Sequence, residues 1–378
     1  MPVSRRTCVE LAAVGLVVLA CAAGCGRSGG SAAKGKILFS AWVDDTPRLV
    51  ALRLHGRPRD EVIPNTQVPD DYSWSPDGET IGFVHDERLY VTDEAGRTRT
   101  MVVPSVDGWA WSPDGRRIAY TYNDIGVVRA DGSDRHVLVR CAPLECSRPA
   151  WSPDSKLLLY HRRSGLETVD VNGGRHVLVR CVLAGCAPPD YGRAAWSPDG
   201  KRIALAQDTR FGCGLSVVRS DGTQLHPILA PIDSPGSCGS VSWSPDGELL
   251  ALDRYDPSST AIYRADGEKW RLVRLIDGAD DAVWSPDGRH LAYLDDYSLL
   301  WVAEATGARP RRFGPAYGFE WSPDGTALVA NQPVQDLRVE GPAPWVIWVI
   351  DVASKRHHRV WPSLGACDNC GDPRWQPR

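Results

Sequence analysis

Short apolar runs bounded by polar turns follow one another along the chain, in the manner of β-strands rather than helices. The runs at 117–120 and 202–205 each follow a Pro-Asp-Gly turn and alternate in strand fashion. In most of the repeated units a further apolar run follows the strand after the turn, at 89–91, 126–128, 215–218, 261–263, 299–302 and 345–348. Turns such as Asp131-Gly132 then lead into a weaker run such as 136–139, and Asp-Gly between apolar runs is a strong hairpin signal.

One turn recurs in nearly identical form and sets the period of the pattern. Seven copies of Trp-Ser-Pro-Asp lie 37 to 47 residues apart, six followed by Gly and one by Ser155, and an altered eighth copy ends the chain. The tryptophans are Trp74, Trp111, Trp151, Trp196, Trp243, Trp284, Trp321 and Trp375. Proline and glycine suit a type I turn, so each copy predicts a hairpin whose first strand ends in Trp. A buried Trp removes roughly 150–250 Å² from water, which makes these residues the expected packing wedges.

The repeat predicts the fold class. Four antiparallel strands in each unit are typical of a β-propeller blade, so we expect an all-β propeller over residues 36–378. The run at 37–40 matches the strand after the turn, and Trp375 matches the strand before it. The C-terminal strand is therefore expected to pair with the N-terminal blade and close a ring of eight blades. Seven is the alternative, if the unit between Trp321 and Trp375 is not a full blade.

The tandem Trp-Ser-Pro-Asp-Gly hairpins resemble the TolB-type, WD-repeat-like propeller repeats of bacterial envelope proteins. The resemblance covers about residues 36–378 and implies a propeller of the bacterial envelope. TolB itself has an extra domain ahead of its propeller, for which about ten residues are available here. Similar repeats also accompany serine-peptidase domains, and no such domain fits this chain.

The first residues are typical of a lipoprotein signal peptide, predicted over 1–24. Arg5 and Arg6 precede an uncharged stretch at 11–23, which is too short to span a bilayer. Small residues then precede Cys25, the predicted lipidation site, with Cys21 as a weaker candidate, and 25–35 form a Gly/Ser-rich tether. These features place the chain in the cell envelope, held by lipid and facing the periplasm or the exterior. The alternative is a plain secreted protein.

Eight further cysteines agree with export. They form four local pairs, Cys141 with Cys146, Cys181 with Cys186, Cys213 with Cys238 and Cys367 with Cys370. An even count in an exported chain predicts disulfides, although eight cysteines allow 105 connectivities. The first two pairs could instead bind zinc. They lie in a duplicated segment, however, and a copied disulfide explains the duplication without a metal. Cys367 and Cys370 have redox-motif spacing without a thioredoxin-like context.

Propeller geometry places all eight cysteines, and the longest loops at 181–193 and 331–344, on one face. Long loops on a rigid scaffold are where binding usually resides. The candidate partner-binding residues on this face are Asp70, Asp71, Tyr72, Asp190, Tyr191, Arg193, Asp280, Asp281, Tyr317, Glu320 and Arg374. The alternative interpretation of each is a solvated loop residue with a turn or capping role.

Motifs for catalysis are missing from the sequence. There is no Gly-x-Ser-x-Gly elbow, no His-Glu-x-x-His and no phosphate-binding glycine loop, and turn chemistry accounts for the repeated aspartates. The net charge of −4 comes without a basic tract, which argues against nucleic acid. We therefore expect a monomeric, non-catalytic propeller that needs no cofactor or metal and binds an envelope protein or peptidoglycan-associated partner. The alternative is a channel-centred lyase or hydrolase acting on an envelope polysaccharide or peptide.

Overall fold

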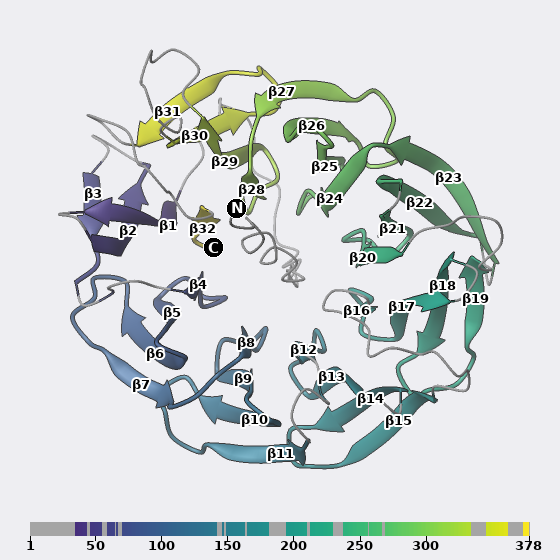
Figure 1. Ribbon diagram of the computed structural model, residues 1–378, viewed down its shortest axis with the longest axis horizontal. Coiled ribbons are helices and arrows are strands. Elements are labelled where there is room, and N and C mark those ends of the chain that lie inside the picture. Colours follow the sequence, from purple (N-terminus) through teal and green to yellow (C-terminus); the bar gives the residue numbers. More distant parts are fainter. Residues whose placement is uncertain are drawn as a thin grey trace, which may run out of the picture.

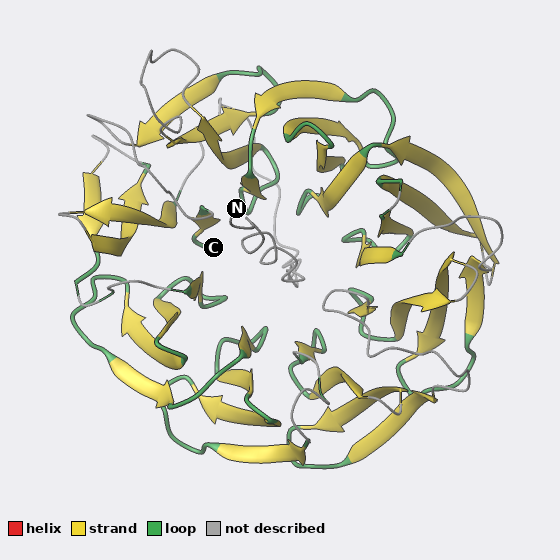
Figure 2. Cartoon of the chain, in the orientation of Figure 1, coloured by secondary structure: helices red, strands yellow, loops and turns green. Residues whose placement is uncertain are grey.

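The computed structural model describes residues 35–43, 46–54, 59–64, 66, 70–141, 146, 149–162, 165–180, 194–209, 212–229, 237–255, 257–266, 269–333, 345–361 and 373–377 of the chain. These residues form eight four-stranded antiparallel sheets arranged as blades around a central axis (Figure 1). The prediction of an eight-bladed propeller is confirmed. Figure 2 shows only strands, loops and turns, and none of the described residues belongs to a helix that could cross a membrane.

Each blade runs outward from the axis in four strands (Figure 1). The innermost strands are β4 (Asp71–Trp74), β8 (Gly108–Trp111), β12 (Ala150–Trp151), β16 (Ala194–Trp196), β20 (Cys238–Trp243), β24 (Ala279–Trp284), β28 (Gly318–Trp321) and β32 (Arg374–Trp375). The second strands are β5 (Thr80–His85), β9 (Arg117–Thr121), β13 (Leu157–Arg162), β17 (Arg202–Thr209), β21 (Leu249–Arg254), β25 (His290–Asp295), β29 (Ala327–Pro333) and β1 (Lys36–Val43).

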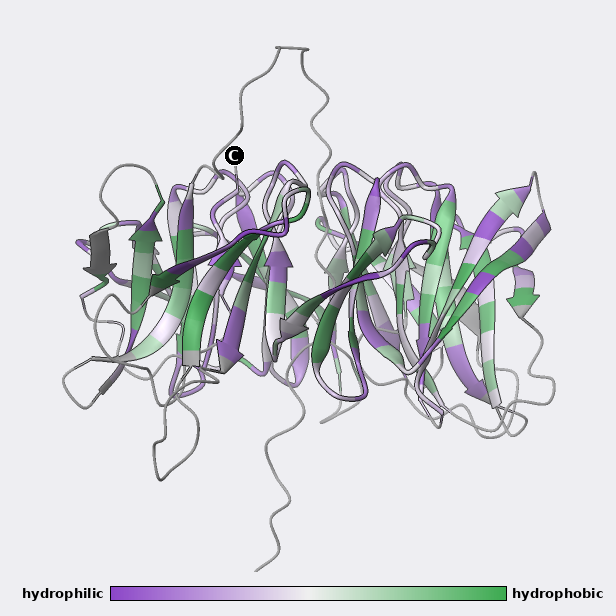
Figure 3. Ribbon diagram, turned by 90° about the horizontal axis from the view of Figure 1, so that it is seen from above, coloured by the Kyte–Doolittle hydropathy of each residue, from purple (hydrophilic) through white to green (hydrophobic). Residues whose placement is uncertain are grey.

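The outer half of each blade is built in the same way. The third strands are β6 (Arg88–Asp93), β10 (Asp124–Arg129), β14 (Gly165–Asp170), β18 (Gly212–Arg219), β22 (Ser259–Asp266), β26 (Leu299–Glu304), β30 (Trp345–Asp351) and β2 (Thr46–Arg53). The outermost strands are β7 (Thr100–Val103), β11 (His136–Arg140), β15 (Arg175–Arg180), β19 (His226–Leu229), β23 (Lys269–Asp277), β27 (Arg311–Pro315), β31 (His357–Trp361) and β3 (Arg59–Val62). Seen edge-on, the strands run across the thickness of the ring (Figure 3).

The ring closes as the sequence predicts. The C-terminal strand β32 pairs with β1, with Trp375 opposite Ile37 and Arg374 opposite Leu38. The sheet order β3-β2-β1-β32 therefore combines the two ends of the chain in one blade. Because β32 contributes only these two residue pairs, closure depends on a short segment.

The repeat tryptophans pack between blades and also join them by hydrogen bonds. All eight are buried except Trp111, which is half-buried. The Trp151 indole Nε1–H donates to the carbonyl oxygen of Ala110 in the preceding blade at 3.1 Å. The same bond recurs from Trp196 to Ala150, from Trp243 to Ala195, from Trp321 to Val283 and from Trp375 to Glu320. Each acceptor immediately precedes the tryptophan of the preceding blade, so the repeat supplies both partners of the bond.

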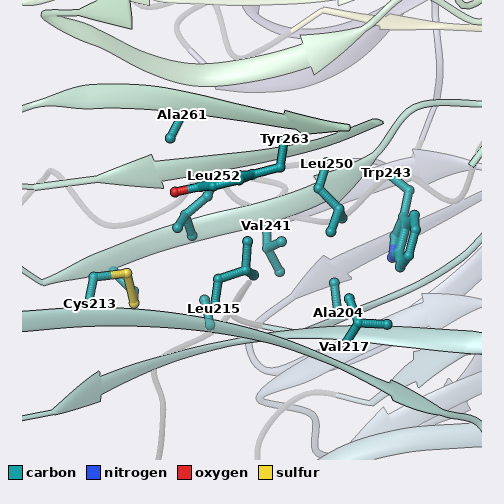
Figure 4. Close-up of a cluster of buried hydrophobic side chains, with 12 residues drawn as sticks. Ala204, Cys213, Leu215, Val217, Val241, Trp243, Leu250, Leu252, Ala261 and Tyr263 are labelled. Atoms are coloured by element: carbon teal, nitrogen blue, oxygen red, sulfur yellow. A yellow bond between two sulfur atoms is a disulfide. The ribbon is translucent and has the colours of Figure 1, made fainter. Parts of the chain in front are cut away.

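Apolar clusters fill the spaces between adjacent blades. One of them joins Ala204, Leu215 and Val217 to Leu250 and Leu252 of the next blade. Figure 4 shows this cluster with Trp243 toward one end and Cys213 toward the other. Adjacent blades therefore share a core, as expected for repeat units that cannot bury their faces alone.

The Ser-Pro-Asp turns are closed by a small hydrogen-bond network that explains their serine. In the turn after Trp111, the Ser112 hydroxyl donates to Asp114 Oδ1 at 2.6 Å and accepts from the backbone N–H of Arg117 at 2.9 Å. The Asp114 carboxylate also accepts the backbone N–H of Arg116 at 3.1 Å. The other turns repeat this arrangement, including the one with Ser155 in the left-handed region at φ 60°. The repeated aspartates thus have the structural role that turn chemistry assigned to them.

Candidate functional site

The two faces of the ring carry different kinds of connection between strands. The turn face bears the Ser-Pro-Asp turns and the turns between third and outermost strands. The loop face bears the turns between second and third strands and the connections from one blade to the next. These two kinds of connection lie together, because the Gly278 N–H, between β23 and β24, donates to the Ser258 carbonyl, between β21 and β22, at 2.8 Å.

Two disulfides brace the loop face. Cys213, near the start of β18, is bonded to Cys238, the first residue of β20, and so joins two blades. Cys141 is bonded to Cys146 in the connection between β11 and β12. For the 25-residue separation of the first pair, the chain-entropy model gives a stabilisation of about 3.5 kcal/mol. The predicted pairs Cys181 with Cys186 and Cys367 with Cys370, and the predicted lipidation site Cys25, lie outside the described residues.

Backbone hydrogen bonds continue this bracing across the blades of β20–β23, β24–β27 and β28–β31. Besides its bond to Ser258, Gly278 accepts the backbone N–H of Asp296 at 3.1 Å. Two residues later, the carbonyl oxygen of Ser298 accepts the N–H of Ala316 at 2.9 Å. These bonds link the turns and connections of successive blades, so they hold the backbone of this part of the loop face together.

A buried carboxyl group lies beneath this part of the loop face. Asp253, in β21, is 2% exposed and accepts the hydroxyls of Ser240 and Thr260, each at 2.6 Å. A Cβ on Gly239 would lie 3.0 Å from Asp253 Cβ, so the β20 backbone passes directly over this residue. Burial raises the pKa of Asp253 to about 7 against the opposing effect of the two hydroxyls, and Asp280 and Asp281 raise it further.

Asp280 and Asp281 belong to a bulge in the innermost strand of the next blade. The pairing of β24 with β25 shifts register between Asp280 and Val283, and Asp281 lies in the left-handed region at φ 53°. Burial is the largest influence on the pKa of Asp280 and raises it. The backbone N–H of Asp281 donates to the Asp280 carboxylate at 2.9 Å and lowers this pKa, whereas the nearby Asp296 raises it. The carboxyl groups of Asp253, Asp280 and Asp281 are therefore close enough to influence one another's ionisation. Among the described residues, no group of three or more His, Cys, Asp or Glu side chains is placed to hold a metal ion.

The exposed tyrosines of the described residues all lie on the loop face. Tyr122, Tyr255 and Tyr297 are 42%, 40% and 83% exposed and lie in turns between second and third strands. Tyr317 is 60% exposed and lies in the connection between β27 and β28. The other exposed large apolar side chains of the described residues lie on the outermost strands β3, β7, β11 and β23 or in the turn before β19, so within this set the aromatic rings belong to the loop face.

The structure brings several predicted residues into one arc of neighbouring blades. Asp280, Asp281, Tyr317, Glu320, Arg374, Asp70 and Asp71 follow one another around four consecutive blades. Glu320 is also part of ring closure, because its carboxylate accepts the backbone N–H of Trp375 at 2.6 Å. Asp190, Tyr191 and Arg193 lie outside the described residues.

Tyr72 does not belong to this exposed surface. Its side chain is 8% exposed and packs among Leu38, Trp74 and Phe83. Its hydroxyl accepts the backbone N–H of Ser40 at 3.0 Å. The alternation of β4 places Tyr72 on the same side as the buried Trp74, so it joins two blades instead of facing a partner.

Sequence reasoning missed Asp253, Tyr122, Tyr255 and Tyr297. The three tyrosines follow the repeat tryptophans by 11 to 13 residues and lie beside turn-forming residues such as Asn123 and Ser298. That narrow range of offsets is a signal from which their position in the same turn of the blade could have been inferred. Asp253 gave no such signal, because it occupies a strand position whose burial depends on the neighbouring blade.

Comparison with known proteins finds structures of the same fold at low sequence identity. No protein-family model and no curated protein matches the chain. A eukaryotic initiation factor structure matches at 13% identity and a TM-score of 0.57, over 92% of this chain and 99% of that one. An oligogalacturonate lyase from Vibrio parahaemolyticus matches at 16% identity and a TM-score of 0.54, over 86% of this chain and 100% of the other.

WD40 and TolB structures are also similar. The C-terminal WD40 domain of Sif2 matches at 13% identity and a TM-score of 0.55, over 76% of this chain and 82% of that one. TolB from Acinetobacter baumannii matches at 15% identity with a TM-score of 0.41, over 81% and 82% of the two chains. At these identities the likenesses concern the fold alone. The chain is therefore an eight-bladed β-propeller.

Proposed function

We propose that this chain is a non-catalytic, envelope-anchored propeller that binds a protein or cell-wall-associated partner through its loop face. The observation that carries the proposal is the contrast between the two faces. Two disulfides and the exposed tyrosines lie on the loop face, whereas the turn face repeats one hydrogen-bonded turn. Tyrosine is among the residues that contribute most to interface energies, and a rigid surface loses little entropy on binding.

An exported location supports this proposal. Disulfides form and persist in oxidising compartments such as the periplasm, and the chain has two of them among its described residues. The leader and Cys25 supply the proposed route to the membrane surface. A propeller held there by lipid would present its loops to envelope components.

The alternative is a channel-centred lyase or hydrolase acting on an envelope polysaccharide or peptide. The fold is shared with oligogalacturonate lyases as well as with WD40 domains, so fold does not separate binding from catalysis. Oligogalacturonate is therefore a direct substrate to assay beside the binding experiment.

Capture of a partner tests the binding proposal. Purified mature protein is immobilised and mixed with detergent-solubilised envelope from its own source. A loop-face variant carries Tyr297→Ala and Tyr317→Ala, and a turn-face control carries Leu225→Ala and Arg289→Ala at exposed positions. We expect the wild type and the control to capture a specific partner, and the loop-face variant to capture at least tenfold less of that partner. Equal capture by all three would reject the loop face, and turnover of oligogalacturonate would favour the enzyme.

Lipidation at Cys25 has its own test. The wild type is expected to sediment with membranes, and Cys25→Ala is expected to appear in the soluble fraction, because it lacks the thiol that would carry the thioether-linked lipid. Mass spectrometry of the mature N-terminus checks the modification directly. Cys21→Ala is the control and should sediment like the wild type. Release of Cys21→Ala instead of Cys25→Ala would move the anchor to the weaker candidate.

A further inference from the structure

The outermost strand β23 is longer than the outermost strands of the other blades. It has nine residues, Lys269–Asp277, whereas the other seven have four to six. It contains no proline, whereas β19 contains Pro227 and β27 ends at Pro315. Among the described strands it pairs only with β22, at the rim of the ring (Figure 1). Its second edge therefore presents a long row of backbone N–H and C=O groups, with which an added strand can pair.

One face of β23 is apolar and partly open to solvent. Leu272 lies opposite Tyr263 and Leu275 opposite Ala261, on the face of the blade that packs toward β16–β19. They share this face because the β22–β23 pairing has a β-bulge between them. The two leucines are 54% and 44% exposed, and Trp270 is partly buried against the same apolar cluster. The core between these two blades therefore continues outward to two half-exposed leucines.

The opposite face of β23 is basic. A Cβ on Gly307, in the turn between β26 and β27, would lie 2.8 Å from Arg274 Cδ, so Arg274 lies on the face toward the next blade. Arg271 lies on the same face, directly opposite Arg264 of β22. Like charges opposite each other on neighbouring strands are destabilising. The outer hairpin of this blade therefore carries a row of arginines that repel one another.

This positive charge is not neutralised within the described part of the chain. No described carboxylate forms an ion pair with Arg264, Arg271 or Arg274. The acidic residue of β22 and β23 on this face is Asp266, which lies opposite Lys269 at the end of the hairpin. A carboxylate brought by another molecule would meet arginines that have no competing ion pair, and charge-assisted hydrogen bonds to arginine are among the stronger ones.

We propose that β23 accepts an extended segment of a protein partner as a fifth strand of its blade, and that this segment alternates apolar and acidic residues. Side chains of an added strand alternate between its two faces. Every second residue would therefore pack beside Leu272 and Leu275, and the residues between them would meet Arg271 and Arg274. Backbone hydrogen bonds supply affinity, and the two faces of β23 set the sequence preference. This interaction surface lies at the rim of the ring and is separate from the loop face.

The charge of β23 disfavours a second copy of the chain at the same edge. Two copies joined in a continuous antiparallel sheet would place arginines beside arginines on one face. Basic side chains on an edge strand are a recognised protection against such self-pairing. An acidic segment meets no such repulsion, so the same residues that exclude a second copy select the proposed partner.

A synthetic peptide tests this inference without knowledge of the partner. The probe is a fluorescein-labelled peptide as long as β23 in which Glu and Val alternate, titrated with the full mature chain in fluorescence anisotropy. The comparisons have Lys in place of each Glu, or the same residues arranged in two blocks. We expect saturable binding of the alternating acidic peptide, and binding weaker by about tenfold or more for the other two. Absence of binding of the alternating acidic peptide would overturn the inference.

Backbone pairing has a readout of its own. In an extended peptide, the N–H groups of the Glu residues point to one edge and those of the Val residues to the other. N-methylation of either set blocks one edge. A strand added in one direction should tolerate one methylated peptide and bind the other about tenfold or more weakly. If both bind as tightly as the parent peptide, the contact is not a strand pairing and the inference fails.

Variants of the two faces locate the binding. Arg271→Glu with Arg274→Glu should weaken binding of the acidic peptide by about tenfold or more and should create binding of the lysine peptide. Leu272→Ser with Leu275→Ser should weaken binding of the acidic peptide to a similar extent, because the apolar residues of the added strand lose their contacts. Circular dichroism confirms that each variant is folded.

Matched controls make the same kinds of change at the rim of distant blades. Arg135→Glu with Arg140→Glu, beside and in β11, repeats the charge change, and Met101→Ser with Val137→Ser, in β7 and β11, repeats the loss of exposed apolar side chains. Both controls should bind the acidic peptide like the wild type. Equal losses in the β23 variants and the controls would contradict the assignment to β23.

Two measurements test the other possible occupants of this edge. In analytical ultracentrifugation the wild type should stay monomeric, and a dimer that Leu272→Ser with Leu275→Ser abolishes would assign β23 to a second copy. Phosphatidylglycerol vesicles and phosphatidylcholine vesicles are each added to the complex with the acidic peptide, and neither should release the peptide. Release by phosphatidylglycerol alone would assign β23 to an anionic bilayer and overturn the proposed protein segment.

Discussion

Replacing Trp375 with alanine is expected to lower the free energy of unfolding by about 4 kcal/mol, near the upper end of large-to-small substitutions in protein cores. Trp375 is 3% exposed and packs against Ile37, Phe39 and Val50. Its indole N–H donates to the Glu320 carbonyl oxygen at 3.2 Å, and its backbone N–H donates to the Glu320 carboxylate at 2.6 Å. The substitution removes the packing and the indole bond together.

The position of Trp375 makes this loss larger than its contacts alone suggest. The strand that closes the ring pairs only two residues with β1, supported by Gln376, whose backbone N–H donates to the Lys36 carbonyl at 2.8 Å. Weakening β32 therefore loosens the contacts that the blade β3-β2-β1-β32 makes with the blades on either side of it. A strand that pairs along its whole length would have more residues to hold it in place after the same substitution.

Urea unfolding followed by far-ultraviolet circular dichroism measures the effect. Trp375→Phe keeps most of the packing and removes the indole donor, so it should cost about 1–2 kcal/mol. Tyr297→Ala, which removes an aromatic ring from an 83% exposed position, should change stability by about 0.5 kcal/mol or less. If Trp375→Ala unfolds at the same urea concentration as Tyr297→Ala, closure does not depend on β32.

Replacing Asp253 with asparagine is expected to change how stability depends on pH. The pKa of Asp253 rises from 3.8 to about 7 in the folded chain, because the carboxyl is buried and lies near Asp280 and Asp281. Between these two pKa values the folded state holds a proton that the unfolded state releases. The stability contributed by the protonated group is therefore fully present below about pH 4 and is lost as the pH rises to about 7.

The size of this effect follows from the same shift. Three pKa units correspond to about 4 kcal/mol, at 1.36 kcal/mol per unit. Asparagine is neutral at every pH and can still accept one hydroxyl and donate to the other, as the protonated acid does. If Asp253→Asn matches the protonated acid below pH 4, we expect it to be more stable than the wild type by about 1.5 kcal/mol at pH 5 and by about 4 kcal/mol at pH 8.

Urea unfolding at pH 5 and pH 8 checks this difference. Asp131→Asn is the control, because hydrogen bonds from the Ser133 hydroxyl and N–H lower the pKa of Asp131 and keep it ionised over this range. The control should follow the pH dependence of the wild type. Parallel curves for wild type and Asp253→Asn between pH 5 and 8 would mean that Asp253 is already ionised at pH 5.

Local chemistry made much of the propeller predictable. Proline and glycine fix the turn after each tryptophan, and apolar alternation fixes the strand that follows, so strand order within a blade can be read residue by residue. The match of Trp375 to the other repeat tryptophans predicted ring closure, and β32 confirms it. The cysteine pairs Cys141–Cys146 and Cys213–Cys238 were also predicted from their proximity in sequence, and both are bonded.

Contacts between blades were decided only by the tertiary structure. The sequence by itself determined the repeat, its turns, the blade pattern and the closing strand, because these depend on neighbouring residues or on identity between copies. It did not determine that Trp151 bonds to Ala110, that Tyr72 is buried or that Asp253 lies beneath Asp280. Those facts depend on how one blade packs on the next, over separations such as the 41 residues between Trp151 and Ala110, and no local pattern encodes that packing.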